Sequence, residues 1–288
     1  MSWPRGASVD PVDTFTRDGL TFDVDDDGPR DGEVVVLLHG WPQDRAAWRR
    51  VTPILNAAGY RTLAPDQRGY SPGARPIAVS AYRLPELLAD VIALIDAAGL
   101  ERAHVVGHDW GGGLAWALAE ARPDRVASLT VLSTPHPRAM QWALLHGDQA
   151  RRSWYMAAFQ IPKVPEWILG RRLERMLTDI GLPAEDAARY GARFRVPGAA
   201  TAGINWYRAL VSPRGVRTGA TGGAGVTVPT TFVWGRDDPA LGRAAAERTA
   251  AYVSGDYAFV DVDAGHWLPE TCAEVVVEQV LARIRSSR

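Results

Sequence analysis

The sequence predicts an α/β fold in which helices flank a mostly parallel, twisted sheet and a helical segment is inserted into it. Short β-branched runs alternate with stretches of helical spacing, beginning with residues 34–38. This alternation is typical of a parallel sheet that is covered on both faces. It stops at the Pro-His-Pro sequence of residues 135–137, and a helical, aromatic and arginine-rich stretch follows to about Gly225. Strand character then resumes at Val228, so the middle stretch is predicted to interrupt one sheet.

The individual strands and helices follow from the apolar pattern. Apolar and β-branched runs predict strands at residues 34–38, 61–64, 103–107, 126–132, 228–235 and 257–262. Helical spacing predicts helices at residues 46–58, 84–98, 112–121 and 272–284. Gly99 follows the second of these helices and is its expected C-cap, because glycine tolerates the left-handed backbone that ends many helices.

The interruption of this pattern predicts the domain organisation. Residues 1–136 and 226–288 are expected to form the two parts of a core domain, and residues 137–225 a helical cap, or lid, between them. Within the cap, the expected helix breaks are Pro162, Pro165, Pro183 and Pro197. The stretch 217–225, rich in Gly, Thr and Ala, is interpreted as a flexible return to the sheet.

The composition argues against several classes of partner. The 288 residues have a formal net charge of −1, which argues against nucleic acid and against anionic membrane surfaces. Cys272 is the only cysteine, so no intramolecular disulfide forms, as expected in a reducing compartment. Residues 1–27 lack the apolar core of a signal peptide, and no run approaches the roughly 18 apolar residues of a membrane span. We therefore expect a cytoplasmic protein with a small-molecule partner, either a monomer or a homodimer.

The most informative motif is Gly107-His108-Asp109-Trp110-Gly111-Gly112. It follows an apolar strand and precedes a helix, which is the layout of a nucleophile elbow, G-x-nucleophile-x-G. The glycines are needed because a Cβ at either position would collide with the neighbouring backbone. Since Asp109 occupies the centre, attack on a carbon atom gives an alkyl ester of its carboxylate. The expected chemistry is therefore cleavage of a carbon–heteroatom bond, at a strained ring or at a carbon with a good leaving group.

Two later strand ends supply the partners that hydrolysis of such an ester requires. His266 follows the last predicted strand and is the expected general base that activates water. Asp238, in the loop after the strand 228–235, is the expected acid that orients His266, and Asp237 is the rival for that role. The spacing Gly-x-x-Asp favours Asp238. The chain order nucleophile, acid, histidine is that of a hydrolase triad on an α/β sheet.

The ester hydrolysis also needs two N–H donors for the oxyanion. One expected donor is the backbone N–H of Trp110, directly after the nucleophile. The other is the backbone N–H of Trp41 in His39-Gly40-Trp41-Pro42, where a cis Trp41–Pro42 bond is plausible for the turn. His39 and His108 are expected to support the site by hydrogen bonds. No pair of histidines has metal-ligand spacing with a carboxylate or thiol, so no metal and no cofactor is expected.

From about Val34 to the C-terminus, the chain resembles an α/β-hydrolase-fold epoxide hydrolase of the soluble type with an aspartate nucleophile. His39-Gly40-Trp41-Pro42, the Asp109 elbow and Asp66-Gln67-Arg68-Gly69-Tyr70-Ser71 carry the resemblance. It implies a role for two cap tyrosines that hold the epoxide oxygen and donate a proton. Ser153-Trp154-Tyr155 and Asn205-Trp206-Tyr207 match these segments, so Tyr155 and Tyr207 are the implied acid pair. Gln43 departs from the family, where a glutamate often follows His-Gly-x-Pro, and is placed with the supporting residues.

The resemblance implies conversion of a lipophilic or aromatic epoxide to a vicinal diol through a hydroxyalkyl ester of Asp109. The first alternative is a haloalkane dehalogenase, which shares the aspartate nucleophile and the tryptophan after it. Such an enzyme stabilises a departing halide with N–H donors, whereas an epoxide oxygen needs a proton. The second alternative is a catalytically silent α/β-hydrolase fold that serves as a small-molecule receptor.

Overall fold

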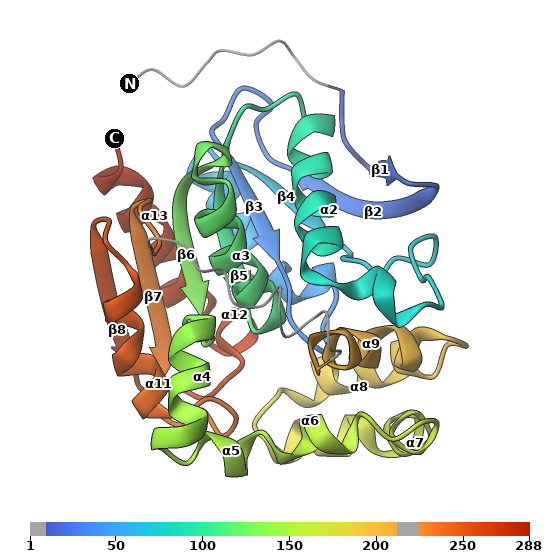
Figure 1. The fold of residues 1–288 in the computed structure, drawn as a ribbon. Coiled ribbons are helices and arrows are strands. Elements are labelled where there is room, and N and C mark those ends of the chain that lie inside the picture. The colour runs from blue at the N-terminus through green and yellow to red at the C-terminus, as the bar shows by residue number, and fades with distance from the viewer. Residues whose placement is uncertain (1–9, 212–224) are drawn as a thin grey trace.

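The computed structural model describes residues 10–211 and 225–288, and its centre is an eight-stranded sheet (Figure 1). The strand order is β1-β2-β4-β3-β5-β6-β7-β8. The two N-terminal strands pair antiparallel, and β4, β3, β5, β6, β7 and β8 run parallel to one another. The strands are β1 (Thr14–Arg17), β2 (Leu20–Asp27), β3 (Val34–Leu38), β4 (Arg61–Pro65), β5 (Ala103–His108), β6 (Val126–Leu132), β7 (Thr230–Gly235) and β8 (Tyr257–Val262).

Helices cover both faces of the sheet. The α-helices are α1 (Thr52–Ala57), α2 (Leu84–Ala97), α3 (Trp110–Ala121), α4 (Pro137–His146), α5 (Gln149–Arg152), α6 (Trp154–Ala158), α7 (Val164–Asp179), α8 (Ala184–Phe194), α9 (Ala199–Val211), α11 (Arg243–Arg248), α12 (Leu268–Thr271) and α13 (Ala273–Ser286). The 3₁₀-helices are η1 (Arg45–Trp48), η2 (Val79–Tyr82), η3 (Pro123–Arg125) and η4 (Thr249–Tyr252). The predicted α/β-hydrolase fold is confirmed in this architecture.

The alternation of side chains along the central strands explains the two layers. In β3, Val34, Val36 and Leu38 belong to the core cluster that also includes residues of α2 and α3. Val35 and Leu37 point to the opposite face, into a second cluster with residues of α1 and α13. All five side chains of β3 are buried, which is the pattern of a strand inside a parallel sheet with two covered faces.

Two parts of the sequence prediction are wrong. The helix expected at residues 46–58 is divided into η1 and α1, because Pro53 in the first turn of α1 lacks the N–H that a continuous helix needs. The strands β1 and β2 were not expected in the acidic N-terminal segment. They form because the rings of Phe15 and Phe22 stack in the core, with 4.6 Å between their centroids, and because buried Asp26 in β2 pairs with Arg61.

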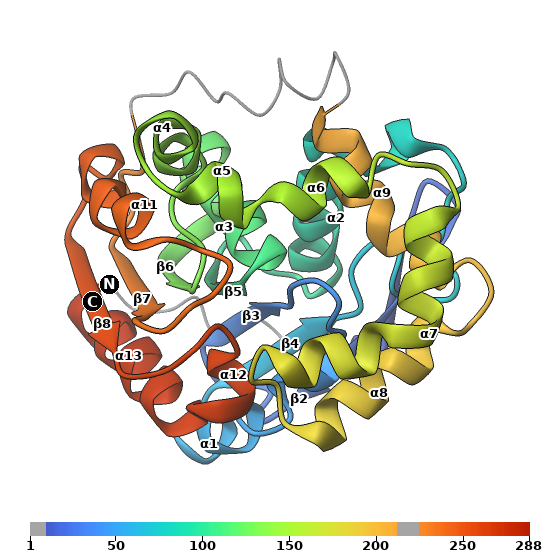
Figure 2. The ribbon, with the colours of Figure 1, turned by 90° about the horizontal axis from the view of Figure 1, so that it is seen from below.

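The helices α4 to α9 lie between β6 and β7 in the chain and stand at the carboxyl ends of the strands, to which the arrowheads of β6 and β7 point in Figure 1. Figure 2 shows α4 to α8 as an arc around these strand ends. The division into core and cap at residues 136 and 225 remains a prediction. Of the expected return loop 217–225, all residues before Gly225 lie outside the described part of the chain. In residues 10–211 and 225–288, no helix has the length and apolar character of a membrane span.

Candidate active site

The turn between β5 and α3 presents Asp109 at the carboxyl edge of the sheet. Asp109 has φ 51° and ψ −120°, a conformation that non-glycine residues rarely adopt. A Cβ at Gly107 would lie 2.3 Å from the Gly111 carbonyl oxygen, and one at Gly111 would lie 2.2 Å from the Leu38 carbonyl oxygen. The two glycines therefore let the turn close tightly against β3, as the elbow motif predicts.

The loop after β3 holds the Asp109 carboxylate. The backbone N–H of Trp41 donates to Asp109 Oδ1 at 2.7 Å, and the Trp41–Pro42 bond is cis, as expected. The Thr134 hydroxyl donates to the Asp109 carbonyl oxygen at 2.8 Å. Thr134 was not predicted from the sequence, since a threonine after a strand carries no signal that distinguishes it from a surface residue. The Asp109 side chain remains 18% exposed, so a small electrophile has access to it.

His266 lies between two carboxylates. Its Nδ1 is 2.7 Å from Asp238 Oδ2, and its Nε2 is 3.6 Å from Asp109 Oδ2. Asp238 is buried, and its other oxygen accepts the backbone N–H groups of Ala240 and Leu241 at 2.8 and 2.9 Å. The rival Asp237 is exposed at the surface. The geometry therefore pairs His266 with Asp238.

The charges of this group are strongly coupled. Burial alone would lower the pKa of His266, but the carboxylates of Asp238 and Asp109 outweigh burial and raise its pKa to about 10. Burial alone would raise the pKa of Asp109, but hydrogen bonding and charge interaction with His266 lower it below its usual value. In the free protein at neutral pH, Asp109 is thus an anion beside an imidazolium.

Trp110 contributes through both its backbone and its ring. It is the first residue of α3, and the first N–H groups of a helix have no acceptor within the helix. The Trp110 N–H is one of these groups, and its role as the second oxyanion donor remains a prediction. The indole ring meets the Tyr207 ring edge-on, with 4.9 Å between the ring centroids. Burial raises the pKa of Tyr207, and a side-chain hydrogen bond from Trp110 offsets part of that rise.

The structure brings Tyr155 of α6 and Tyr207 of α9 together. Their ring centroids are 5.8 Å apart, although 51 residues separate them in the sequence. Burial raises the pKa of both phenols, and the negative charge of Asp109 raises both further. Both hydroxyls are therefore protonated at neutral pH, and both lie within the electrostatic range of Asp109.

His39, Gln43 and His108 contact one another or the loop of residues 40–42, which is called the candidate oxyanion loop because it carries the Trp41 N–H. Their expected supporting role remains a prediction. His39 Nδ1 lies 2.9 Å from the Gly40 carbonyl oxygen, and burial lowers its pKa, so it is neutral. Gln43 Oε1 accepts the Gly40 N–H at 2.6 Å and lies 2.8 Å from His108 Nδ1. These contacts fix the backbone that presents the Trp41 N–H.

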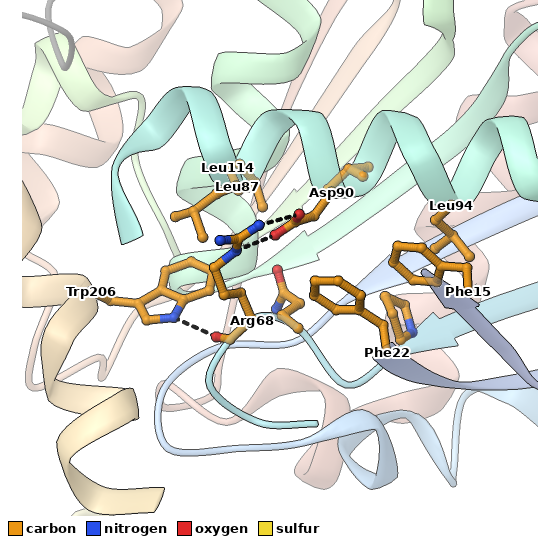
Figure 3. Close-up of a pocket in the computed structure, with 11 residues that line it drawn as sticks. Phe15, Phe22, Arg68, Leu87, Asp90, Leu94, Leu114 and Trp206 are labelled. Atoms are coloured by element: carbon orange, nitrogen blue, oxygen red, sulfur yellow. Dashed lines mark hydrogen bonds and ion pairs between the residues drawn. The ribbon is translucent and has the colours of Figure 1, made fainter. Parts of the chain in front are cut away.

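Two features beside the site carry no catalytic group. In the described ranges, no cluster of three or more His, Cys, Asp or Glu side chains could hold a metal ion. Figure 3 shows a small cavity that is lined by Trp206, Arg68 and Asp90, among other residues. The Trp206 indole N–H donates to the Arg68 carbonyl oxygen at 2.8 Å, and Arg68 also pairs with Asp90. The cavity volume is about 10 Å³, the space of roughly one water molecule, so it is too small for an organic substrate.

Comparison with known proteins places this geometry in a family. Residues 33–271 match the model of the α/β hydrolase fold family. The chain belongs to this family. A member from Bacillus subtilis, the AB hydrolase superfamily protein YfhM, is 38% identical over 280 residues, which cover 93% of this chain and 96% of the relative.

Other relatives carry a more specific name. Epoxide hydrolase A of Mycobacterium tuberculosis is 34% identical in an alignment that covers 90% of this chain and 91% of the relative. The crystal structure of epoxide hydrolase A from Mycobacterium thermoresistibile superimposes with a TM-score of 0.82 at 30% sequence identity, covering 94% of this chain and 97% of that one. The expected resemblance to epoxide hydrolases is therefore confirmed.

Proposed function

We propose that the protein hydrolyses epoxides to vicinal diols through a covalent hydroxyalkyl ester on Asp109. The observation that carries the proposal is that two sets of groups act on Asp109. His266, paired with Asp238, lies 3.6 Å from the Asp109 carboxylate and can activate water, and the charge of Asp109 acts on the paired phenols of Tyr155 and Tyr207. An epoxide oxygen needs a proton as the ring opens, and a protonated phenol can supply it.

In the first step, the Asp109 carboxylate attacks a ring carbon and inverts it, while a tyrosine proton passes to the departing oxygen. The step removes the negative charge of Asp109. Because that charge raises the pKa of both phenols in the free protein, its loss makes them stronger acids when the alkoxide develops. The loss of the negative charge of Asp109 also lowers the pKa of His266, because the Asp109 carboxylate raises that pKa in the free protein.

In the second step, His266 acts as the base. The His266 imidazolium first gives its proton to the tyrosinate that ring opening left behind. This transfer restores the phenol and makes His266 neutral. Neutral His266, oriented by Asp238, then takes a proton from water, and the resulting hydroxide attacks the ester carbon. The N–H groups of Trp41 and Trp110 stabilise the oxyanion. Collapse of this intermediate expels the diol oxygen, which takes the proton of the newly formed Asp109 carboxylic acid. The diol is thus released, and the Asp109 carboxylate is left beside a charged His266.

The surroundings of Tyr207 support a lipophilic or aromatic substrate. Its ring contacts other aromatic rings at centroid distances of 4.9 to 5.8 Å, namely Trp41, Trp110, Tyr155 and Phe159. Such walls bind apolar groups, while the hydroxyls and N–H groups provide orientation. The epoxide hydrolase names among the relatives support an epoxide as the reacting group.

Product analysis tests the proposal. The purified protein is incubated with an aryl epoxide and, separately, with a bromoalkane of similar size, and Asp109→Ala is the control. The proposal expects diol from the wild type, none from the control and no bromide. Bromide without diol would favour the haloalkane dehalogenase, for which the indole N–H of Trp41, buried and unbonded among the described residues, is the candidate halide donor. Binding of either compound without any product would favour a silent receptor.

A further inference from the structure

Glu270 is a buried acid close to the candidate site. It lies in α12, four residues after His266, and only 4% of it is exposed. Its Oε1 accepts the Gln43 Nε2–H at 2.7 Å and the Tyr190 hydroxyl at 2.8 Å. Among the described residues, its Oε2 is buried and has no hydrogen-bond partner. A buried, half-satisfied carboxyl group is costly for stability, so its presence here calls for a functional reason.

The Gln43 amide connects the Glu270 carboxyl group to the oxyanion loop by hydrogen bonds, so the charge of Glu270 affects that loop. Gln43 Oε1 must face the Gly40 N–H, 2.6 Å away, because the opposite orientation would bring two donors together. The amide N–H groups are therefore directed to Glu270. A carboxylate at Glu270 polarises the amide, and hydrogen bonds in such a chain strengthen one another. The Gly40 N–H, one residue before the Trp41 donor, is then held more firmly.

The same amide acts on His108. His108 Nδ1 lies 2.8 Å from Gln43 Oε1, and its Nε2 lies 2.9 Å from the His266 carbonyl oxygen. Both neighbours are acceptors, and a neutral imidazole has a single N–H to donate. Burial lowers the pKa of His108 to about 4, so it is neutral. When Glu270 is ionised, the polarised Gln43 Oε1 favours the His108 tautomer that carries its proton on Nδ1. When Glu270 is neutral, His108 can carry the proton on Nε2 and donate it to the His266 carbonyl oxygen.

We propose that ionised Glu270 is a positioning residue for ester hydrolysis, which acts through Gln43 on the oxyanion loop and on the proton of His108. This inference rests on the proposed function. Tyr190 belongs to α8, so its hydroxyl also ties this carboxylate to the helices over the site. In the described residues, the titratable or charged groups that face Glu270 or its neighbours include Tyr190 and Asp186 from α8, Asp44 from the loop before η1, and His108 and His266 beyond Gln43. Arg49 and Arg50, which follow η1, pair with Asp186, and Arg193 of α8 pairs with Asp44, so both of these carboxylates have positive partners.

The first test compares the rate of ester hydrolysis in the wild type and in Glu270→Gln across pH. Burial raises the pKa of Glu270 to about 7. Near pH 8.5 we expect the variant to be about tenfold slower, the effect of losing one polarised hydrogen bond. Near pH 5.5 the ratio of the two rates should approach about one, because wild-type Glu270 is then protonated and, like the glutamine, carries no charge. Because His266 is present in both proteins, the effect of its titration on the rate cancels in the ratio. Glu274→Gln, an exposed acid in α13, is the matched control and should show no pH-dependent ratio.

The second test needs no enzymatic activity. In ¹⁵N-labelled protein, the backbone amides of Gly40 and Trp41 should shift with a midpoint near pH 7, and Glu270→Gln should abolish that transition. Tyr190→Phe should move the midpoint to higher pH, since the Tyr190 hydrogen bond lowers the pKa of Glu270. Amide shifts that persist in Glu270→Gln, or a rate ratio that is constant across pH, would overturn the inference. If the amides respond as expected and no epoxide is hydrolysed, the proposed function fails and the coupling of Glu270 to the loop stands.

Discussion

The backbone of Asp109 predicts that the nucleophile is held at a cost in stability. Its φ of 51° and ψ of −120° lie where an L-residue with a Cβ is strained by about 1–3 kcal/mol. Glycine adopts this conformation without the strain, but it loses about 0.5–1 kcal/mol more conformational entropy on folding than alanine does. Asp109→Gly should therefore be more stable than Asp109→Ala by about 1 kcal/mol, the reverse of the usual order.

The comparison isolates the backbone, because both variants remove the carboxylate and its interaction with His266. The free energy of unfolding is measured for both by urea titration under identical conditions, and thermal melts should differ by about 2–3 °C in the same direction. Gly113, in α3, provides the control: Gly113→Ala meets no atom within 4 Å and should stabilise the protein. If Asp109→Gly is less stable than Asp109→Ala, the argument from strain is refuted.

Three further predictions concern the site and the fold. His266→Gln should accumulate a covalent adduct on Asp109 when treated with an epoxide, because ring opening needs no base; an intact mass without the adduct would contradict the assigned role. Replacing either cap tyrosine by phenylalanine should slow adduct formation by roughly 10²–10⁴-fold, measured in single turnovers, and an unchanged rate would make the phenols structural. Asp26→Asn should lower the free energy of unfolding by about 3–5 kcal/mol, because Arg61 is left buried without its partner, whereas Asp124→Asn at the surface should change it little. Burial alone would raise the pKa of Asp26, but its hydrogen bonds and the charge of Arg61 lower it below 3.8, so its contribution should be present above pH 3.8 and lost as the pH falls below it. A stability that is constant through that range would contradict the ion-pair argument.

Much of the fold and of the site was predictable because the signals are local. The buried run of β3 and the glycines around Asp109 report constraints that act within a few residues. The split between η1 and α1 was missed because amphipathic spacing continues across Pro53. The strands β1 and β2 were missed because Asp26 reads as a solvent-exposed acid until its ion pair with Arg61 is known.

The triad acid, the tyrosine pair and Glu270 depend on contacts between residues that lie far apart in the sequence. The spacing Gly-x-x-Asp favours Asp238 over Asp237, but only the contact with His266, 28 residues away, shows which carboxylate turns inward. Tyr155 and Tyr207 were placed by family resemblance alone, since two tyrosines on separate helices have no spacing rule. Glu270 was not singled out, because its partners lie 227 and 80 residues away in the sequence.

Isotope transfer in a single turnover tests the covalent ester most directly. Enzyme in excess is mixed with an aryl epoxide in ¹⁸O-labelled water, and the diol and the peptide that contains Asp109 are analysed by mass spectrometry. The ester mechanism predicts an unlabelled diol from the first turnover and ¹⁸O in the Asp109 carboxylate. A singly labelled diol with an unlabelled Asp109 would mean that water attacks the epoxide directly, and the nucleophilic role of Asp109 would be wrong.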